Sequence, residues 1–238
     1  MALPVIQSLT YETTLPLSGT VVQYRPYTVA DEKLIIQGAN ALKDKDVNFY
    51  ARNVKKVIKS CINGDPDNII EKLSFVDIEW LLIQIRAKSV GEIIEAKFPD
   101  PETKRPTNAS INLEEFVLIQ DEKHSKKIEI TDTIGIMMRD IGFEEKLRLI
   151  AEIEEKGAGV MYDIIVDCVD CLYDDETIYR VGENMTKKEL AQFIDNTSGI
   201  SKNLQEYIAT MPRLKGEIVL DNGKTIDISG SEIAFLLL

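Results

Sequence analysis

A set of short segments occurs twice along the chain in the same order, and this repetition limits the folds that the chain can adopt. The echoed pairs are 31–34 and 144–147, 58–62 and 165–169, 74–77 and 186–189, and 91–94 and 216–219. We therefore expect an α+β fold of two similar halves, residues 1–120 and 121–238, each containing helices and a β-hairpin. Such halves would arise by internal duplication and pack as one unit. A duplicated scaffold favours a protein that joins partners over one built around a single reactive cleft.

The composition argues against several classes of partner. The chain has 238 residues, of which 44% are hydrophobic and 29% charged, as in an ordinary globular protein. Its net charge of −12 disfavours nucleic acid and anionic membrane surfaces as main partners. No apolar stretch has the roughly 18 to 20 residues that cross a bilayer. The cysteine number is odd and Met1–Pro4 lacks a signal-peptide pattern, so we expect synthesis in a reducing cytosol.

The spacing of apolar residues predicts the secondary structure of both halves. In the first half we expect a hairpin at 9–27, helices at 29–42, at 46–62 and after Ser74, and strands near 93–96 and 111–116. The helix after Ser74 is apolar around nearly its whole circumference, which predicts either burial on both sides, as in a central core helix, or a place in an interface. After a polar linker at 120–127 we expect strands at 128–131 and 134–139, helices at 143–156, 159–174, 187–196 and 200–210, and a hairpin at 217–228.

Residues that commonly carry chemistry are few in this chain. His124, the single histidine, lies in the predicted linker, and we expect it to be a solvated loop residue. Cys168 and Cys171 fall on the apolar side of the predicted helix 159–174, so we expect buried, unbridged thiols without a metal. No phosphate-binding loop, zinc-protease motif or serine-hydrolase motif occurs. We therefore expect no catalytic residues, no metal site and no cofactor.

Four aspartates are the main candidates for binding a partner. Asp163, Asp167, Asp170 and Asp174 would form one acidic stripe along the predicted helix 159–174, opposite its apolar side. A solvated acidic face is one interpretation. The others are a surface for a basic partner and a divalent-cation site, the latter in a metal-dependent hydrolase that uses carboxylates of Asp163–Asp175.

The apolar segment at the end of the sequence is the second candidate for partner binding. Leu236, Leu237 and Leu238 would be exposed at a free C-terminus. We expect them either to tuck under the fold or to be held by a partner, and the sequence favours neither alternative.

Several segments together resemble a known family. The segments are 22–29 with 32–34, 75–79, 84–92 and 210–215. They resemble T4-type bacteriophage baseplate hub subunits and hub-assembly proteins, nearly from end to end. The most specific piece is Arg86–Glu92, at a predicted helix-to-strand junction. The resemblance brings no catalytic residues, and cysteine pairs that relatives carry in the following hairpin are replaced by a loop with Pro99, Asp100, Pro101 and Pro106.

The resemblance implies a non-enzymatic structural or assembly component of a contractile phage tail baseplate hub. Such a protein acts through contacts with other hub or tail proteins, and its place is the virion tail baseplate. The alternative is a cytoplasmic assembly chaperone, for example for the tape measure protein, that leaves before the virion matures. The two alternatives differ in whether the protein remains in purified particles.

Overall fold

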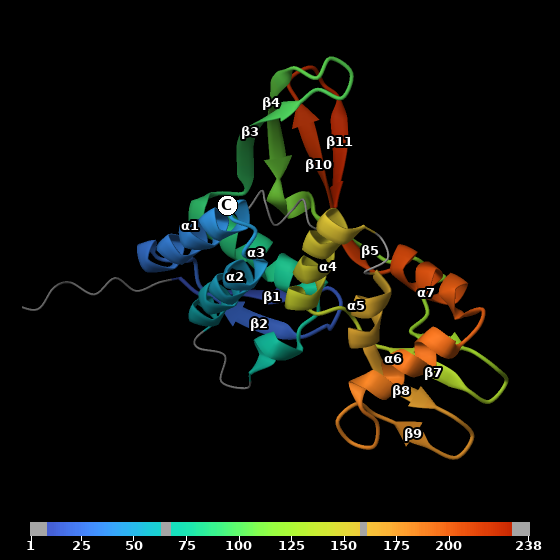
Figure 1. Cartoon of the computed structure of the whole chain (residues 1–238). Helices are drawn as coiled ribbons and strands as arrows, with labels where there is room; N and C mark the ends of the chain where they lie inside the picture. Colours follow the sequence, from blue (N-terminus) through green and yellow to red (C-terminus); the bar gives the residue numbers. More distant parts are fainter. Residues whose placement is uncertain (1–8, 63–67, 158–160, 230–238) are drawn as a thin grey trace, which may run out of the picture. The chain divides into compact units, whose positions relative to one another are not determined.

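The computed structural model describes residues 9–62, 68–157 and 161–229 (Figure 1). Its contacts divide the chain into two compact units. The first unit comprises Met1–Ile119 together with Arg213–Leu238, and the second comprises Gln120–Pro212. The predicted halves, 1–120 and 121–238, differ from these units at the C-terminal end, because Arg213–Ser229 lies in the first unit. The α+β class is confirmed.

The first unit begins with a hairpin and three helices, which lie within three residues of the predicted ranges. These elements are β1 (Tyr11–Thr14), β2 (Val21–Tyr24), α1 (Val29–Lys43), α2 (Val47–Cys61) and α3 (Phe75–Val90), with a 3₁₀ turn, η1 (Ile69–Lys72), before α3. Thr28 caps α1 in a reciprocal arrangement, in which its side chain accepts from the Asp31 amide and Asp31 accepts from the Thr28 amide. Ser74 caps α3 by accepting from the Asp77 amide at 3.1 Å.

Helix α3 is the central helix of this unit, as its apolar circumference predicted. Ile78, Leu81 and Ile83 are fully buried. Ile83 belongs to a core cluster that also contains Ile111, Ile218 and Ile228 from the sheet described next. One side of α3 therefore packs on that sheet, and burial of such aliphatic side chains stabilises the fold by roughly 1.5–3 kcal/mol each.

An antiparallel sheet completes the first unit and joins segments from both ends of the chain. Its strands are β3 (Ile93–Pro99), β4 (Pro106–Asn112), β5 (Val117–Ile119), β10 (Arg213–Leu220) and β11 (Thr225–Ser229), and a 3₁₀ turn, η2 (Leu113–Glu115), precedes β5. The order is β11-β10-β4-β3, and β5 also pairs with β10. Ile111 lies between Ile94 and Ile218, so one face of the sheet is apolar. The predicted turn of the last hairpin is confirmed, since Gly223 has the positive φ of 80° that this turn requires.

Polar contacts tie the tips of the two long hairpins together. The buried Asp100 accepts from the amides of Glu102 and Thr103 in its own turn and from the Asn222 side chain of the other turn. These hydrogen bonds, with the nearby Lys224, hold the pKa of Asp100 well below its usual range.

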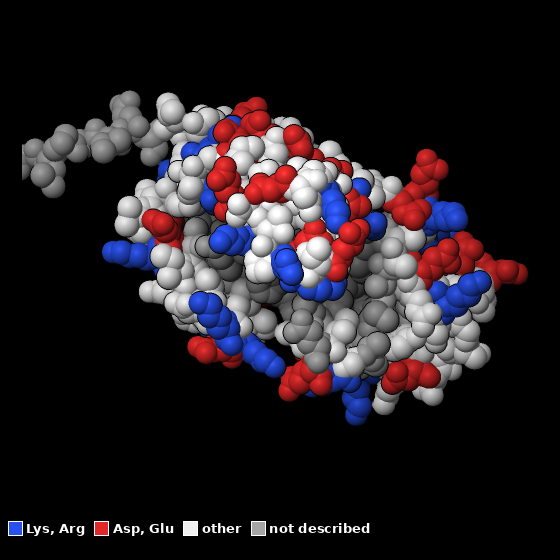
Figure 2. All heavy atoms as spheres, turned by 90° about the horizontal axis from the view of Figure 1, so that it is seen from above, with Lys and Arg blue, Asp and Glu red and all other residues white. Residues whose placement is uncertain are grey.

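Seen from above, acidic and basic side chains are interspersed, and neither sign dominates the visible face (Figure 2).

The described residues of the second unit, 120–157 and 161–212, form a four-stranded sheet and four helices. Its elements are β6 (Lys127–Glu129), β7 (Gly135–Met138), α4 (Phe143–Lys156), α5 (Met161–Asp167), β8 (Val169–Tyr173), β9 (Ile178–Tyr179), α6 (Lys187–Asn196) and α7 (Ile200–Ala209). The strand order is β6-β7-β8-β9, and every pairing is antiparallel. The predicted helices at 143–156, 187–196 and 200–210 are confirmed.

The predicted helix 159–174 is wrong beyond Asp167. Helix α5 ends there, and Val169–Tyr173 is strand β8. The Cys168 carbonyl accepts a hydrogen bond from the Arg139 amide just after β7, and Met137 pairs with Cys171. Val169 and Cys171 are buried and Asp170 between them is exposed, which fits a strand with one buried face, although Leu172 is buried as well. Pairing with β7 therefore decides the conformation of this segment.

The polar segment 120–127 marks the boundary between the units, but His124 is not a solvated loop residue. His124 is half-buried, its Nδ1 lies 3.0 Å from Thr210 Oγ1, and its ring packs on Tyr207 with centroids 5.2 Å apart. Burial lowers its pKa. The segment thus lies against the end of α7.

The internal duplication stays a prediction. Both regions contain a hairpin followed by two helices, then a hydroxyl-capped helix and a closing hairpin. The second region also has two helices, α6 and α7, where the first has α3 alone, and its additional hairpin β8–β9 lies before Glu189. In addition, Gly91 ends a helix, whereas Gly216 lies inside β10, so this pair of echoes is not equivalent.

Candidate functional site

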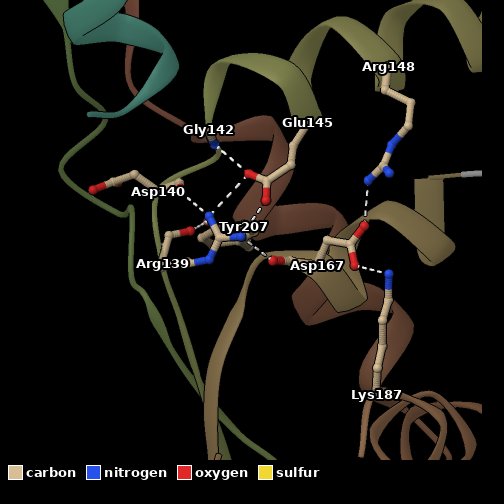
Figure 3. A network of polar contacts seen from close by, with 8 residues as sticks. All are labelled: Arg139, Asp140, Gly142, Glu145, Arg148, Asp167, Lys187 and Tyr207. Atoms are coloured by element: carbon tan, nitrogen blue, oxygen red, sulfur yellow. Dashed lines mark hydrogen bonds and ion pairs between the residues drawn. The ribbon is translucent and has the colours of Figure 1, made fainter. Parts of the chain in front are cut away.

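A cluster of charged side chains surrounds Arg139 in the second unit (Figure 3). Arg139 follows β7, and its guanidinium binds both oxygens of the Glu145 carboxylate. Nη1 also donates to the Asp140 carbonyl at 3.2 Å, and Nη2 donates to the Asp167 carbonyl at 2.5 Å. Such bidentate, charge-assisted bonds are stronger and more directional than neutral ones. Arg139 therefore joins the end of β7, the start of α4 and the end of α5.

The neighbours of Arg139 complete this cluster. Glu145 accepts from the Gly142 amide at 2.7 Å, and this satisfies a free N–H at the start of α4. The Tyr207 hydroxyl of α7 donates to the Arg139 carbonyl at 2.6 Å. Glu145 is the main cause of the raised pKa of Arg139. We call Arg139, Glu145 and the backbone groups that they bind the second clamp, because they lie in the second unit. A first clamp, in the first unit, is described below.

Asp167 uses its carboxylate within the fold. One oxygen binds Arg148 of α4, and the other binds Lys187 at the start of α6 (Figure 3). The Asp167 side chain is 16% exposed. A partner would have to compete with two internal cations for this carboxylate.

Asp170 and Asp174 do not continue a stripe from Asp167 along one helix. Asp163 lies on α5, but its side chain is outside the described part. Asp170 is exposed on β8. Asp174 lies in the β8–β9 turn, where it accepts from the amides of Glu176 and Thr177 and from the Tyr179 hydroxyl, and these bonds lower its pKa. The single acidic helix face is therefore wrong, because the helix that would carry it ends at Asp167.

Three further expectations concern the leucines at the end of the sequence, metal binding and membrane spans. Leu236, Leu237 and Leu238 lie outside the described residues. Among residues 9–62, 68–157 and 161–229, no group of three or more His, Cys, Asp or Glu side chains is arranged to hold a metal ion. The same ranges contain no helix long and apolar enough to cross a bilayer.

The first unit contains a matching arrangement around Arg25. Arg25 Nη1 donates to Asp31 at 3.1 Å and to the carbonyl of the following residue, Pro26, at 2.7 Å. Nη2 donates to the Ser60 hydroxyl at 2.6 Å. The Arg25 amide donates to the Cys61 carbonyl, as the Arg139 amide does to Cys168. We call Arg25, Asp31 and the groups that they bind the first clamp.

Neither clamp was predicted from the sequence, although the sequence contains a local signal for both. In both, the arginine precedes its carboxylate by six residues, and that carboxylate accepts from the amide of the residue that caps the following helix. The equivalence of Cys61 and Cys168 supports the echo of 58–62 in 165–169. The carboxylate partners of the two arginines are Asp31 and Glu145. The repeat of 31–34 therefore begins at Glu145 and not at Glu144, one residue later than the sequence comparison placed it.

The cysteines are packing residues in both units. Cys61, Cys168 and Cys171 are buried free thiols, as we expected for Cys168 and Cys171. Burial raises the pKa of Cys61 to about 12, with Asp31 adding to the effect. Burial likewise raises the pKa of Cys168 to about 12, with Glu145 adding to it. Thiols with such pKa values are poor nucleophiles at neutral pH.

The two units differ in net charge. Residues 120–212 contain 20 acidic and 11 basic side chains, whereas the rest of the chain contains 20 and 17. The difference of nine places −9 of the net charge of −12 in the second unit. This unit is therefore the more suitable of the two for attracting a basic protein surface.

The sequence as a whole matches the family described as T4 bacteriophage base plate protein over residues 8–232. The chain belongs to this family. The match covers the described residues of both units and confirms the resemblance to T4-type bacteriophage baseplate proteins. No curated protein and no solved structure shows significant similarity. Membership implies a place in the phage tail and association with other baseplate proteins.

Proposed function

We propose that this baseplate protein is a non-enzymatic structural component of the hub of a contractile tail. The family match over residues 8–232 carries the proposal, because it includes both units rather than one domain fused to another. The internal use of Asp167 agrees with a scaffold role, since its carboxylate fixes helices within the unit. The partners are other hub or tail proteins, and contacts with them constitute the function.

The acidic second unit supports this proposal through its charge. Asp170 is exposed on β8 and forms no ion pair within the described structure. An excess of acidic side chains increases the rate at which a basic partner surface is met, and rim charges affect association rate more than affinity. The hub neighbour of this unit would accordingly present a basic surface.

Mass spectrometry of purified virions and of infected-cell lysate tests the proposal. A structural subunit should be present in virions at a constant ratio to other baseplate proteins. Presence in the lysate together with absence from virions would overturn the structural role. That outcome would favour the alternative, a chaperone that holds another tail protein, such as the tape measure protein, in the host cytoplasm.

A further inference from the structure

A small apolar pocket lies among α1, α2 and α3 of the first unit. The buried side chains of Tyr50, Val54 and Val57 form its base, and the half-buried Ile35 and Leu82 form its sides. Its volume is about 30 Å³, which is two or three water-sized spheres and suits the tip of one aliphatic side chain. Because the lining offers water few hydrogen-bonding partners, filling the pocket with methyl groups is favourable.

The position of α1 is fixed by its contacts with α2. A Cβ atom on Gly38 would lie 3.2 Å from the Tyr50 ring, so this glycine allows close approach of the two helices. The Asn53 amide donates to the Leu34 carbonyl at 3.2 Å. These contacts hold Ile35 at the side of the pocket. The pocket is therefore formed by the packing of α1 on α2.

Two polar groups line the same pocket. Arg86 is half-buried, and its described hydrogen bond is a long one, 3.5 Å from Nη1 to the Gly91 carbonyl. Among the described residues no carboxylate lies within ion-pair distance of Arg86. A half-buried guanidinium without a carboxylate is costly, and it favours a ligand that supplies one.

A hydrogen bond from the Tyr27 amide to α3 holds Tyr27 beside Arg86. Its amide donates to the Ser89 hydroxyl at 2.9 Å, and this hydroxyl donates to the Ile85 carbonyl at 2.5 Å. Burial raises the pKa of Tyr27 although Arg86 opposes this, so the phenol is protonated at neutral pH and can donate a hydrogen bond. The segments 22–29 and 84–92, which carried the resemblance to baseplate proteins, thus meet at this pocket.

We infer that the pocket binds a segment of another tail protein that inserts one aliphatic side chain and places an Asp or Glu carboxylate against Arg86. The apolar base selects the aliphatic group, and the guanidinium with the Tyr27 hydroxyl selects the carboxylate. Charge complementarity therefore defines the partner: an acidic residue beside Leu, Ile or Val. This inference rests on the proposed function only in naming a tail protein as the partner.

A pair of peptides tests the chemistry with the full-length protein. The probes are the capped tetrapeptides Ala-Glu-Leu-Ala and Ala-Gln-Leu-Ala, with binding followed by methyl NMR signals of Val54, Val57 and Ile35. We expect the Glu peptide to bind about tenfold more tightly, the effect of one charge-assisted hydrogen bond. Arg86→Gln should abolish this preference, and Arg213→Gln, which changes an exposed arginine of β10, should retain it. Equal affinities for wild type, or a preference that survives Arg86→Gln, would overturn the inference.

Photo-crosslinking from Leu82 in infected cells tests the partner. The crosslinked peptide should come from another tail protein and contain an aliphatic residue next to Asp or Glu, and its yield should fall in the Arg86→Gln variant. A crosslink to residues 230–238 of this chain, or to a segment without a carboxylate, would overturn the inference. Neither result bears on the presence of the protein in virions, so failure of this inference and failure of the structural role are distinguishable.

Discussion

The two clamps use the same backbone connections but place their charges differently. In the first clamp Arg25 and Asp31 are 20% and 6% exposed, and the third partner is a neutral hydroxyl, Ser60. In the second clamp Arg139 and Glu145 are 41% and 24% exposed. The residue at the position of Ser60 is Asp167, whose side chain turns to Arg148 and Lys187 instead. The same local design is thus a buried ion pair in one unit and the centre of a wider charged network in the other.

Two copies of one motif need not contribute equally to stability. A buried carboxylate that loses its cation is left unpaired in a medium that solvates it poorly, whereas an exposed one regains water. The first clamp should therefore be the more costly to break. The second should depend more on ionic strength, because its charges lie nearer to solvent.

The largest effect is expected from Arg25→Met, which keeps the aliphatic stem and removes the charge. Asp31 would lose its cation, and we expect the first unit to lose about 3 kcal/mol of stability. Hydrogen exchange of the α1 amides measures this change, and Arg213→Met provides the control at an exposed arginine. A loss below that of the equivalent change in the second clamp would reverse the comparison.

Arg139→Met should cost less, about 2 kcal/mol, because Glu145 can be rehydrated. The loss of stability should appear as faster hydrogen exchange of the α4 amides and of the amides at the start of β8. Raising the salt concentration should shrink the difference from wild type more than it does for Arg25→Met. Equal salt dependence of both variants would contradict the assignment of the second clamp as the more exposed one.

Asp167→Asn sharpens the comparison at the position where the clamps differ. If Asp167 and Asp170 shared an exposed acidic stripe that binds a basic partner, Asn at both positions would leave the protein at least as stable and would slow capture of a hub partner. The ion pairs with Arg148 and Lys187 now predict a loss of about 1 kcal/mol for Asp167→Asn. Asp170→Asn is the matched control and should change stability by less than about 0.5 kcal/mol. Urea unfolding of the two single variants measures both effects, and equal stabilities would show that the network contributes nothing.

The slowing of partner capture stays a prediction for Asp170, which is exposed. Stopped-flow association of Asp170→Asn with a basic hub partner at low salt is the measurement. A rate equal to that of wild type would leave Asp170 as an ordinary solvated charge.

The smallest effect concerns pH. Burial raises the pKa of Asp31, but hydrogen bonds from Thr28 and Ser60 and the contact with Arg25 outweigh it, so the folded pKa lies below the ordinary value. The contribution of the ionised Asp31 is thus present above about pH 4 and is lost as pH falls through the lowered pKa. Asp31→Asn should be less stable than wild type at pH 7, and the gap should narrow below pH 4. Denaturation midpoints across this range measure it, and a constant gap would contradict the lowered pKa.

Local sequence signals located most elements because their causes are local. Thr28 with Asp31 and Thr186 with Glu189 mark helix starts through hydrogen bonds three residues apart, and the turn at Gly223 needs a positive φ. The site was less predictable. The prediction of a stripe Asp163–Asp174 failed because its four members were placed on one helix. In each clamp the arginine and its carboxylate are only six residues apart, but the contacts that complete the clamp join segments that are distant in the sequence.

Patterns in the sequence were enough to predict the α+β class, the apolar central helix α3, the family and the hairpins other than β8–β9. The tertiary structure was needed to show that 169–173 is a strand, because its apolar residues Val169, Cys171 and Leu172 continue the apolar stripe of the preceding helix as well as they fit a strand. Pairing with β7 made the choice. The tertiary structure also decided that the last hairpin joins β4 in the first unit. The physical reason is the same in both cases: helix caps and turns depend on neighbours in the chain, whereas strand pairing depends on which distant edge is available.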